Sequence, residues 1–264
     1  MKQLLIYYYH STVWASLLFI LPLTGCNYHT KNNMISQQKI IIEYQEGMDI
    51  SHHQKNIDWK QLTPSNSNKA FIIAKATEGK SYQDPKFIDN YKNICSVGFQ
   101  PGAYHFLRFG SSSAKDQMDN FIGQIQAAQK LTDQTSLANN EPIIALDVEE
   151  SNGSDYSLVS SVVEESVRYL KEINITPFIY TRQNFWDQHV KTTPDIVKKC
   201  PLWIARYRST PPSSNELPNG WQEWKIWQYS STGSVPGIQG NVDLNKMQLQ
   251  NQLQMRHTPS IDVI

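Results

Sequence analysis

The sequence predicts an α/β protein in which about eight strands close into a barrel. From Ile40 onward, short runs rich in β-branched and aromatic residues alternate with amphipathic helical stretches, which is typical of a mostly parallel sheet with crossover helices. The chain has 264 residues, 39% of them hydrophobic, and so fits one large domain of the size usual for α/β barrels. Ser209 to Gly220 is a loop rich in Pro, Ser and Asn, so we expect fewer helices and an irregular barrel in the last third.

Each predicted strand is a short β-rich run between polar or turn-forming segments. The eight runs are Ile40 to Ile50, Ala70 to Thr77, Pro101 to Leu107, Ile143 to Glu149, Pro177 to Thr181, Leu202 to Tyr207, Lys225 to Tyr229 and Val242 to Leu244. We expect the barrel domain to span residues 40–250 and a polar tail to follow at 251–264.

Two helices have clear sequence signals. The first starts at Ser113, with Asp116 three residues later as in a capping box. Its apolar face comprises Met118, Phe121, Ile122 and Ile125. The second begins near Asp155 and carries Val159, Val162, Val163, Val167 and Leu170 at helical spacing.

The charge balance excludes some classes of partner. Lys and Arg together number 24, as do Asp and Glu, so no long-range field recruits nucleic acid or acidic lipid. The sequence has no Gly-rich phosphate loop and no Gly-x-Ser-x-Gly elbow. Aromatic residues make up 11% of the chain, and their faces can stack on sugar rings as well as fill a core. We expect a monomer without nucleic-acid partners.

The N-terminus predicts export and a lipid anchor. Val13 to Leu23 is an apolar run too short to span a bilayer, and it is typical of the hydrophobic region of a signal peptide. It leads into Leu23-Thr24-Gly25-Cys26, which resembles the lipobox of bacterial lipoproteins. We therefore expect a signal peptide at residues 1–25, a lipidated Cys26 and a polar tether at 26–39. Such a protein would be a lipid-anchored membrane protein of the cell envelope, facing the periplasm or the cell exterior.

Cys95 and Cys200 remain as a possible disulfide pair if Cys26 carries lipid. An exported protein can form such a bond. Two buried thiols are an equally good interpretation, because the sequence does not show whether the two Cα atoms come within bridging range.

The strongest catalytic signal is a pair of acids at the end of a buried strand. In Ile143-Ile144-Ala145-Leu146-Asp147-Val148-Glu149, side chains alternate between faces, so Asp147 and Glu149 point the same way. Two neighbouring acids in an apolar strand are unfavourable unless they are paired or functional. One of them should keep its proton to a higher pH and be available as a general acid.

Other strand ends supply further candidate residues, because the active sites of such barrels lie at the C-terminal ends of their strands. These candidates are Asp49, Tyr104, His105, Tyr180, Trp203, Arg206, Tyr207, Trp227, Gln228, Tyr229 and Asp243. Glu78 lies in a polar loop where a salt bridge to a neighbouring Lys is expected. His52 and His53 should point to opposite faces of an extended chain, so we expect no metal site and no cofactor.

A set of ordered motifs resembles family 25 of the glycoside hydrolases, the lysozymes that cleave between N-acetylmuramic acid and N-acetylglucosamine in peptidoglycan. The resemblance covers about Gly47 to Asn245. The motifs are Gly47-Met48-Asp49-Ile50-Ser51-His52, Asn56-Ile57-Asp58-Trp59, Ala74-Lys75-Ala76-Thr77-Glu78-Gly79, Pro101-Gly102-Ala103-Tyr104-His105-Phe106, Leu146-Asp147-Val148-Glu149, Pro201-Leu202-Trp203-Ile204-Ala205-Arg206-Tyr207, Ile226-Trp227-Gln228-Tyr229-Ser230 and Gly240-Asn241-Val242-Asp243-Leu244-Asn245. This chain has His53 where the family usually has Trp.

The resemblance implies a flattened, irregular TIM-like β/α barrel that acts on peptidoglycan glycan strands. It also implies that Glu149 is the acid and that Asp147, Asp49 and Asp243 support it. We expect Glu149 to protonate the glycosidic oxygen while Asp147, kept ionised by its hydrogen bonds, stabilises positive charge at the sugar ring.

The attacking group is left open by the sequence, although the acetamide of the muramic acid is favoured over a protein carboxylate or a direct attack by water. The residues expected to bind substrate are Tyr104, His105, Tyr180, Trp203, Tyr207 and Trp227. Two alternatives are a peptidoglycan-binding lipoprotein without catalysis and a chitinase-like hydrolase.

Overall fold

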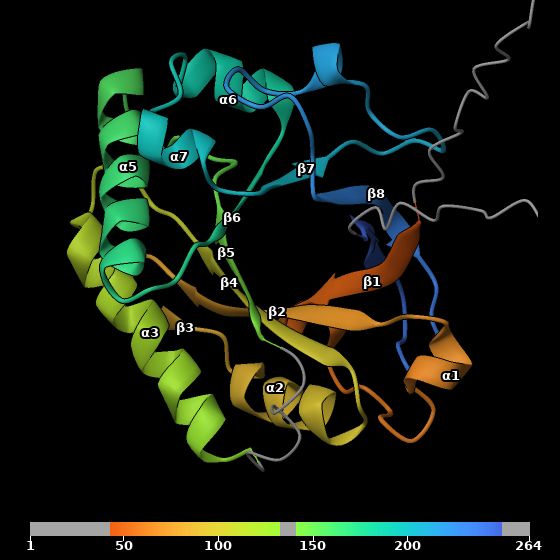
Figure 1. Ribbon diagram of the computed structural model, residues 1–264. Coiled ribbons are helices and arrows are strands. Elements are labelled where there is room, and N and C mark those ends of the chain that lie inside the picture. The colour runs from red at the N-terminus through yellow and green to blue at the C-terminus, as the bar shows by residue number, and fades with distance from the viewer. Residues whose placement is uncertain (1–42, 133–140, 250–264) are drawn as a thin grey trace, which may run out of the picture. The chain divides into compact units, whose positions relative to one another are not determined.

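The computed structural model describes residues 43–132 and 141–249, and the strands within them form a closed barrel (Figure 1). The strands of the barrel are β1 (Tyr44–Ile50), β2 (Phe71–Glu78), β4 (Gln100–Phe106), β5 (Ile143–Asp147), β6 (Phe178–Thr181), β7 (Leu202–Ala205), β8 (Ile226–Gly233) and β9 (Val242–Gln248). The short strand β3 (Tyr82–Gln83) folds back on the end of β2. The predicted barrel is confirmed.

The barrel closes through the pairing of β1 with β2, and its other neighbours follow the order β1-β9-β8-β7-β6-β5-β4-β2. All of these pairs are parallel except those made by β9, which runs antiparallel to both β1 and β8. Residues 234–241, which connect β8 to β9, include no helix. A parallel return needs a crossover of a dozen or more residues, so this short connection forces the reversal.

Several strand boundaries differ from the prediction. Strand β7 ends at Ala205, two residues before the predicted end, and β8 continues to Gly233, four residues beyond it. Strand β5 ends at Asp147, two residues before the predicted end, although Val148 N still donates to Tyr180 O at 2.9 Å and keeps the chain extended. Strand β9 continues to Gln248, because its polar second half pairs with both β1 and β8. Polar residues between two strands give no hydrophobic signal in the sequence.

The two predicted helices are confirmed as α3 (Ala114–Lys130) and α5 (Tyr156–Glu172). Ser113 Oγ accepts a hydrogen bond from Asp116 N, and the carboxylate of Asp155 accepts from the first amides of α5. Both caps satisfy amides that lack a partner within the helix. Helix α2 (Phe87–Ser96) was not predicted, and it has no side-chain cap at its start.

The two long helices lie on one side of the barrel. In Figure 1, α3 and α5 run along the outside of β4, β5 and β6. The remaining helices are the short segments α1 (Pro64–Ser67), α6 (Gln183–His189) and α7 (Asp195–Lys198). Between β7 and β8 the only helical segment is a 3-10 turn at Ser214–Glu216, which confirms the predicted irregular last third. None of the helices in the described ranges is both long and apolar enough to cross a membrane.

Side chains of the strands alternate between two apolar clusters. On β2, Phe71 and Ile73 belong to a cluster inside the barrel, whereas Ile72 and Ala74 belong to the cluster between barrel and helices. This alternation follows from the two-residue period of a strand. Gly47 permits the interior packing, because a Cβ there would lie 2.3 Å from the ring of Phe71.

Cys95 and Cys200 are free, buried thiols in the structure. Cys95 lies in α2, and Cys200 lies just before β7. Burial raises the pKa of each thiol to about 11, so both are inert at neutral pH. The sequence left open whether Cys95 and Cys200 form a disulfide or are two buried thiols, and in the structure they are two buried thiols. Cys26 and the predicted signal peptide and tether lie outside the described residues, as does the polar tail.

Candidate active site

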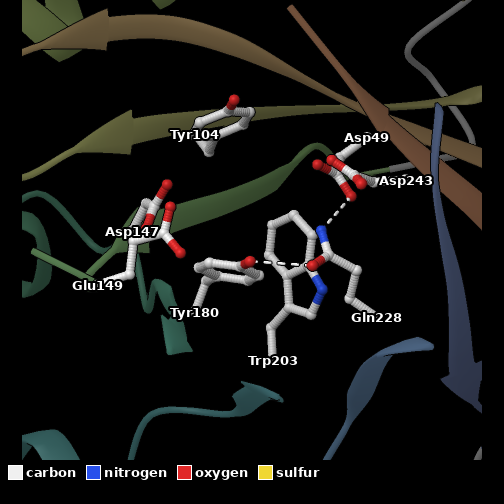
Figure 2. Close-up of a pocket in the computed structure, with 8 residues that line it drawn as sticks. All are labelled: Asp49, Tyr104, Asp147, Glu149, Tyr180, Trp203, Gln228 and Asp243. Carbon is white, nitrogen blue, oxygen red and sulfur yellow. Dashed lines mark hydrogen bonds between the residues drawn. The ribbon is translucent and has the colours of Figure 1, made fainter. Parts of the chain in front are cut away.

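A pocket opens at the end of the barrel where β5 finishes, and it is rich in acids and aromatics (Figure 2). Its lining comprises Asp49, Tyr104, Asp147, Glu149, Tyr180, Trp203, Gln228 and Asp243. Parallel strands contribute their C-terminal ends, and antiparallel β9 contributes its N-terminal end at Asp243. The structure thus brings together all four predicted acids and three of the six residues predicted to bind substrate.

Asp147 and Glu149 lie on the same side of the chain, as the strand alternation predicts (Figure 2). Val148 between them is buried in the outer apolar cluster. Burial raises the pKa of Asp147 well above its usual range, and the neighbouring Glu149 carboxylate adds to the shift. Burial also raises the pKa of Glu149, against the opposing effect of the Arg182 cation. The pair therefore retains a proton to unusually high pH.

The environment of Asp147 differs from the prediction. We expected hydrogen bonds to keep this carboxyl ionised, but its buried Oδ1 has no hydrogen-bond partner among the described residues. Burial without donors favours the neutral form instead. The strand sequence indicates burial but not the absence of donors around it. An unpartnered acceptor at the wall of the pocket is available to an N–H or O–H group of a ligand.

Glu149 forms an ion pair with Arg182, whose Nη2 lies 3.0 Å from Oε2 of Glu149. The glutamate side chain is 23% exposed, and the arginine side chain is 54% exposed. Arg182 was not among the residues predicted for the site. It follows Tyr180 by two residues on extended chain, so the same alternation that placed Tyr180 in the pocket could have placed Arg182 beside it.

Asp49 and Asp243 form a second acidic pair on the opposite wall (Figure 2). They are directly paired across β1 and β9, and a hydrogen bond joins their carboxyl groups. Burial and the charge of Asp243 raise the pKa of Asp49 to about 8. Asp49 Oδ2 also accepts from Gln228 Nε2 at 2.8 Å and Asn245 Nδ2 at 2.7 Å. The arrangement fits one shared proton held by Asp49.

Gln228 connects this pair to the aromatic wall. Its Oε1 accepts from the hydroxyl of Tyr180 at 2.9 Å and from that of Tyr207 at 3.0 Å. The side chain is buried and central to the pocket, whereas Gln228 was predicted only as a residue at a strand end. An amide that accepts on one side and donates on the other fixes the orientation of its neighbours.

The aromatic residues of the pocket are held rigidly. Tyr180 and Trp203 meet edge to face with ring centroids 4.8 Å apart, and Trp203 Nε1 donates to Asn245 Oδ1 at 2.8 Å. Burial and the surrounding acids raise the pKa values of Tyr104 and Tyr180 well above the usual range. Their hydroxyl groups are therefore neutral hydrogen-bond donors. Tyr207 is half exposed and joins the pocket through Gln228.

The structure does not bring His105 or Trp227 into the pocket. His105 is fully buried on the outer face of β4, where Nδ1 lies 2.7 Å from Thr77 Oγ1 and Nε2 lies 3.2 Å from Gln117 Oε1. Burial lowers the pKa of His105 to about 4, so the ring is neutral. Trp227 packs in the outer cluster. Each is the strand neighbour of a pocket residue, and alternation turns it away.

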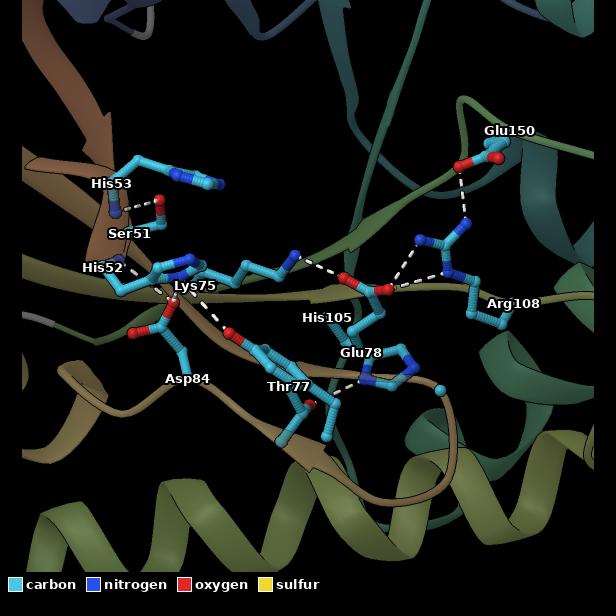
Figure 3. A network of polar contacts seen from close by, with 12 residues as sticks. Ser51, His52, His53, Lys75, Thr77, Glu78, Asp84, His105, Arg108 and Glu150 are labelled. Carbon is cyan, nitrogen blue, oxygen red and sulfur yellow. Dashed lines mark hydrogen bonds and ion pairs between the residues drawn. The ribbon is translucent and has the colours of Figure 1, made fainter.

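His52 and His53 do not point apart as predicted. Ser51 caps a 3-10 turn at His52–Gln54, and this turn brings the two ring centroids to 4.0 Å. His52 Nδ1 lies 2.7 Å from the buried carboxylate of Asp84 (Figure 3). The local capping signal of Ser51 and Gln54 outweighed the extended conformation expected after a strand. No cluster of three or more potential metal ligands occurs in the described parts of the chain.

An ion-pair chain supports the loop that carries Glu149 (Figure 3). Lys75 Nζ lies 2.6 Å from Glu78, Glu78 accepts from Arg108, and Arg108 also pairs with Glu150. The predicted bridge from Glu78 to a neighbouring Lys is confirmed, but Glu78 is the last residue of β2 and not part of a loop. Because Glu150 directly follows Glu149, this chain of charges ties the end of β5 to β2 and β4.

Comparison with known proteins decides the family. The model of the glycosyl hydrolases family 25 matches residues 48–238, which include three of the four pocket acids. The chain belongs to this family. It is therefore a glycoside hydrolase, and the resemblance seen in the sequence is confirmed at the level of the family.

Family 25 relatives match most of the described chain. Lysozyme M1 of Streptomyces globisporus is 32% identical over 208 residues, covering 76% of this chain and 67% of that protein. The autolytic lysozyme of Clostridium acetobutylicum is 30% identical, and the match spans 55% of its length. The N,O-diacetylmuramidase of Chalaropsis sp is 29% identical, covering 75% of this chain and 95% of that protein.

Solved lysozyme structures share the barrel. The bacterial lysozyme from Streptomyces coelicolor superposes with a TM-score of 0.63 at 29% identity, covering 77% of this chain and 91% of that one. The family GH25 lysozyme from Aspergillus fumigatus gives 0.62 at 26% identity, covering 78% and 94%.

Proposed function

We propose that this protein is a muramidase that hydrolyses the β-1,4 bond between N-acetylmuramic acid and N-acetylglucosamine in peptidoglycan. The observation that carries the proposal is the pocket of four acids, with Asp147 and Glu149 on one wall and Asp49 and Asp243 on the other. Relatives named as lysozymes and an N,O-diacetylmuramidase support the choice of substrate.

Glu149 is the proton donor in this proposal. It is more exposed than Asp147, so it can reach the glycosidic oxygen of a glycan strand lying across the pocket. As the bond between C1 and that oxygen breaks, the Glu149 proton passes to the leaving oxygen. The raised pKa of Glu149 suits this role, because the acid must be protonated near neutral pH.

The acetamide of the muramic acid is the proposed attacking group. Its carbonyl oxygen forms a bond to C1 as the glycosidic bond breaks, and water later opens the resulting ring while Glu149 takes a proton from that water. The unpartnered Oδ1 of Asp147 supports this route, because the acetamide N–H would satisfy it. A hydrogen bond from substrate favours the ionised form of Asp147, which in turn raises the affinity of Glu149 for the proton of the pair.

The other pocket residues position the sugar. Trp203 and Tyr180 offer rigid aromatic surfaces, and the neutral Tyr104 hydroxyl is a donor to sugar oxygens. Asp49 and Asp243 lie on the wall of the pocket opposite Asp147 and Glu149, and Gln228 joins Asp49 to Tyr180 on the aromatic wall. This network would hold the polar groups on that side of the bound sugar.

Digestion of purified peptidoglycan beside chitin oligosaccharides tests the proposal. New reducing ends are labelled by reduction and identified. A muramidase exposes muramic acid ends and leaves chitin oligosaccharides intact. Exposed N-acetylglucosamine ends or cleavage of chitin would indicate a chitinase-like hydrolase, and no cleavage of either polymer would indicate a binding protein.

We further propose that Cys26 carries a lipid that anchors the enzyme in the cell envelope, facing the periplasm or the cell exterior. The apolar run and the lipobox-like Leu23-Thr24-Gly25-Cys26 support this. Residues 26–39 would then act as a tether that confines hydrolysis to nearby wall. Labelling cells with a radioactive fatty acid should mark the wild-type protein and not Cys26→Ser. Equal labelling of both would overturn the anchor.

A further inference from the structure

Arg182 is the accessible cation at the acidic pocket. The chain is extended from Tyr180 to Arg182, so both side chains lie on the pocket side, while Thr181 turns away and donates to Val148 O. The guanidinium donates to Oε2 of Glu149 through Nη2. Its side chain remains 54% exposed, which leaves donors open to a ligand.

Two other cations near β5 are committed elsewhere in the described structure. Lys75 has a side chain that is only 11% exposed, and it bonds to Glu78. Arg108 is bound between the carboxylates of Glu78 and Glu150. Arg182 differs from both because its one carboxylate partner in the described structure is Glu149, the proposed proton donor.

This pairing opposes the role of Glu149. A cation in contact with a carboxylate favours the ionised form, and a general acid must carry a proton. The groups that face Glu149 are the acids Asp147, Glu150 and Asp243, the cations Lys75 and Arg182, and the neutral hydroxyls of Tyr180 and Tyr207. Of these, Arg182 is in direct contact and exposed, so a substrate anion could draw it away without breaking the buried network.

We propose that Arg182 binds a carboxylate of the muramic acid unit and, in doing so, releases Glu149 from its ion pair. This inference rests on the proposed muramidase function. Muramic acid bears a lactyl ether two carbons from the reacting C1, and N-acetylglucosamine has no ionised group. The anion is either the lactyl carboxylate of peptide-free strands or a carboxylate of the attached peptide. A planar guanidinium binds either one through paired hydrogen bonds.

Three forms of one glycan separate these sources. The first bears its peptides, the second has a free lactyl carboxylate after removal of the peptides, and the third is the second with that carboxylate converted to the neutral methylamide. We expect wild-type kcat/KM to be at least about tenfold higher on the second form than on the third. A similar advantage of the first form over the third would identify the peptide carboxylate as a ligand of Arg182.

The variants Arg182→Gln and Arg182→Lys locate the effect. Gln should reduce the preference for a carboxylate to within about twofold, and Lys should retain part of it. The alkaline limb of the kcat/KM profile should move to higher pH in Arg182→Gln, because Glu149 loses its cation. Arg168→Gln, on the exposed face of α5, is the matched control and should keep the wild-type preference and profile.

Equal cleavage of all three glycans by the wild type would overturn the role of Arg182 and leave the muramidase function standing. Cleavage of none of them would overturn the muramidase function itself. Circular dichroism checks that each variant is folded. If Arg182→Gln is not folded, the wild-type preference and the Arg182→Lys variant still test the proposal. An unchanged preference for a carboxylate and an unchanged pH profile in the Lys variant would contradict it.

Discussion

The side-chain amide of Gln228 donates to Oδ2 of Asp49 at 2.8 Å, across two strands that are not neighbours in the barrel. Strand β9 lies between them, and its Asn245 donates to the same oxygen. Because the other end of the Gln228 amide accepts from Tyr180, the contact joins the second acidic pair to the aromatic wall. The shape of the pocket therefore depends on a residue that carries no charge.

Replacing Gln228 with Leu should destabilise the barrel and slow hydrolysis. The substitution leaves the buried hydroxyl of Tyr180 without its acceptor and the buried carboxyl of Asp49 without one donor, and each unsatisfied buried group costs about 1–3 kcal/mol. We expect the free energy of unfolding to fall by about 2–4 kcal/mol in urea titrations. Gln126→Leu, at an exposed position of α3, should change it by less than about 0.5 kcal/mol. A Gln228 variant as stable as this control would show that the network has no structural role.

Asp49→Asn should change how stability depends on pH. The folded state holds a proton on Asp49 up to about pH 8, whereas an unfolded Asp loses it near its model value of 3.8. The folded state binds more protons between these values, so the contribution of Asp49 to stability falls as pH rises through this window. Asn mimics the protonated form. We expect the stability advantage of the variant over the wild type to grow by an amount on the order of 4 kcal/mol between pH 5 and pH 8.5.

The control for this experiment is Asp119→Asn, an exposed acid on α3 whose pKa is lowered by Lys115. The stability difference between this variant and the wild type should not grow between pH 5 and pH 8.5. If Asp49→Asn gives the same flat difference, Asp49 does not hold a proton in the folded protein.

Asp147→Asn should stabilise the protein while it slows the reaction. The wild-type carboxyl is buried with an unpartnered oxygen, and removal of its potential charge should raise the free energy of unfolding at pH 7 by about 1–3 kcal/mol. The rate of peptidoglycan hydrolysis should fall by about a hundredfold, because Asn provides no charge to stabilise the developing acetamide cation. Asp195→Asn at the exposed start of α7 is expected to alter neither quantity. Loss of both stability and activity would mean that Asp147 is mainly structural.

Reductant should leave thermal stability unchanged, because Cys95 and Cys200 are free thiols. The melting temperatures of residues 40–264 with and without dithiothreitol are expected to agree within about 1 °C, since a disulfide is typically worth 2–4 kcal/mol. A drop of several degrees in dithiothreitol would indicate a bond between the two residues.

The sequence predicted the barrel and the acids of the site because both depend on local patterns. Apolar runs marked the strands, and the two-residue period placed Asp147 and Glu149 on one face. The same rule, applied to neighbours, would have separated Tyr104 from His105 and Gln228 from Trp227. These assignments failed because all strand-end residues were treated as facing the pocket.

Other features of the site depend on tertiary contacts and could not be predicted from the sequence. The pairing of Asp49 with Asp243 follows from the antiparallel insertion of β9 between β1 and β8. The raised pKa of Asp147 follows from its burial beside Glu149, and its Oδ1 has no hydrogen-bond partner among the described residues; only the packed barrel determines both. The contact between Arg182 and Glu149 joins the ends of two adjacent strands across the rim of the pocket.

The role of Glu149 as proton donor is tested most directly by measuring Glu149→Gln on two substrates with different leaving groups. One is the natural glycan, and the other is the same muramyl unit bearing a dinitrophenolate leaving group, which needs no proton. We predict that the variant loses at least about a thousandfold in kcat/KM on the glycan but less than about tenfold on the dinitrophenyl substrate. Equal losses on both substrates, or an unchanged rate on the glycan, would contradict the assignment.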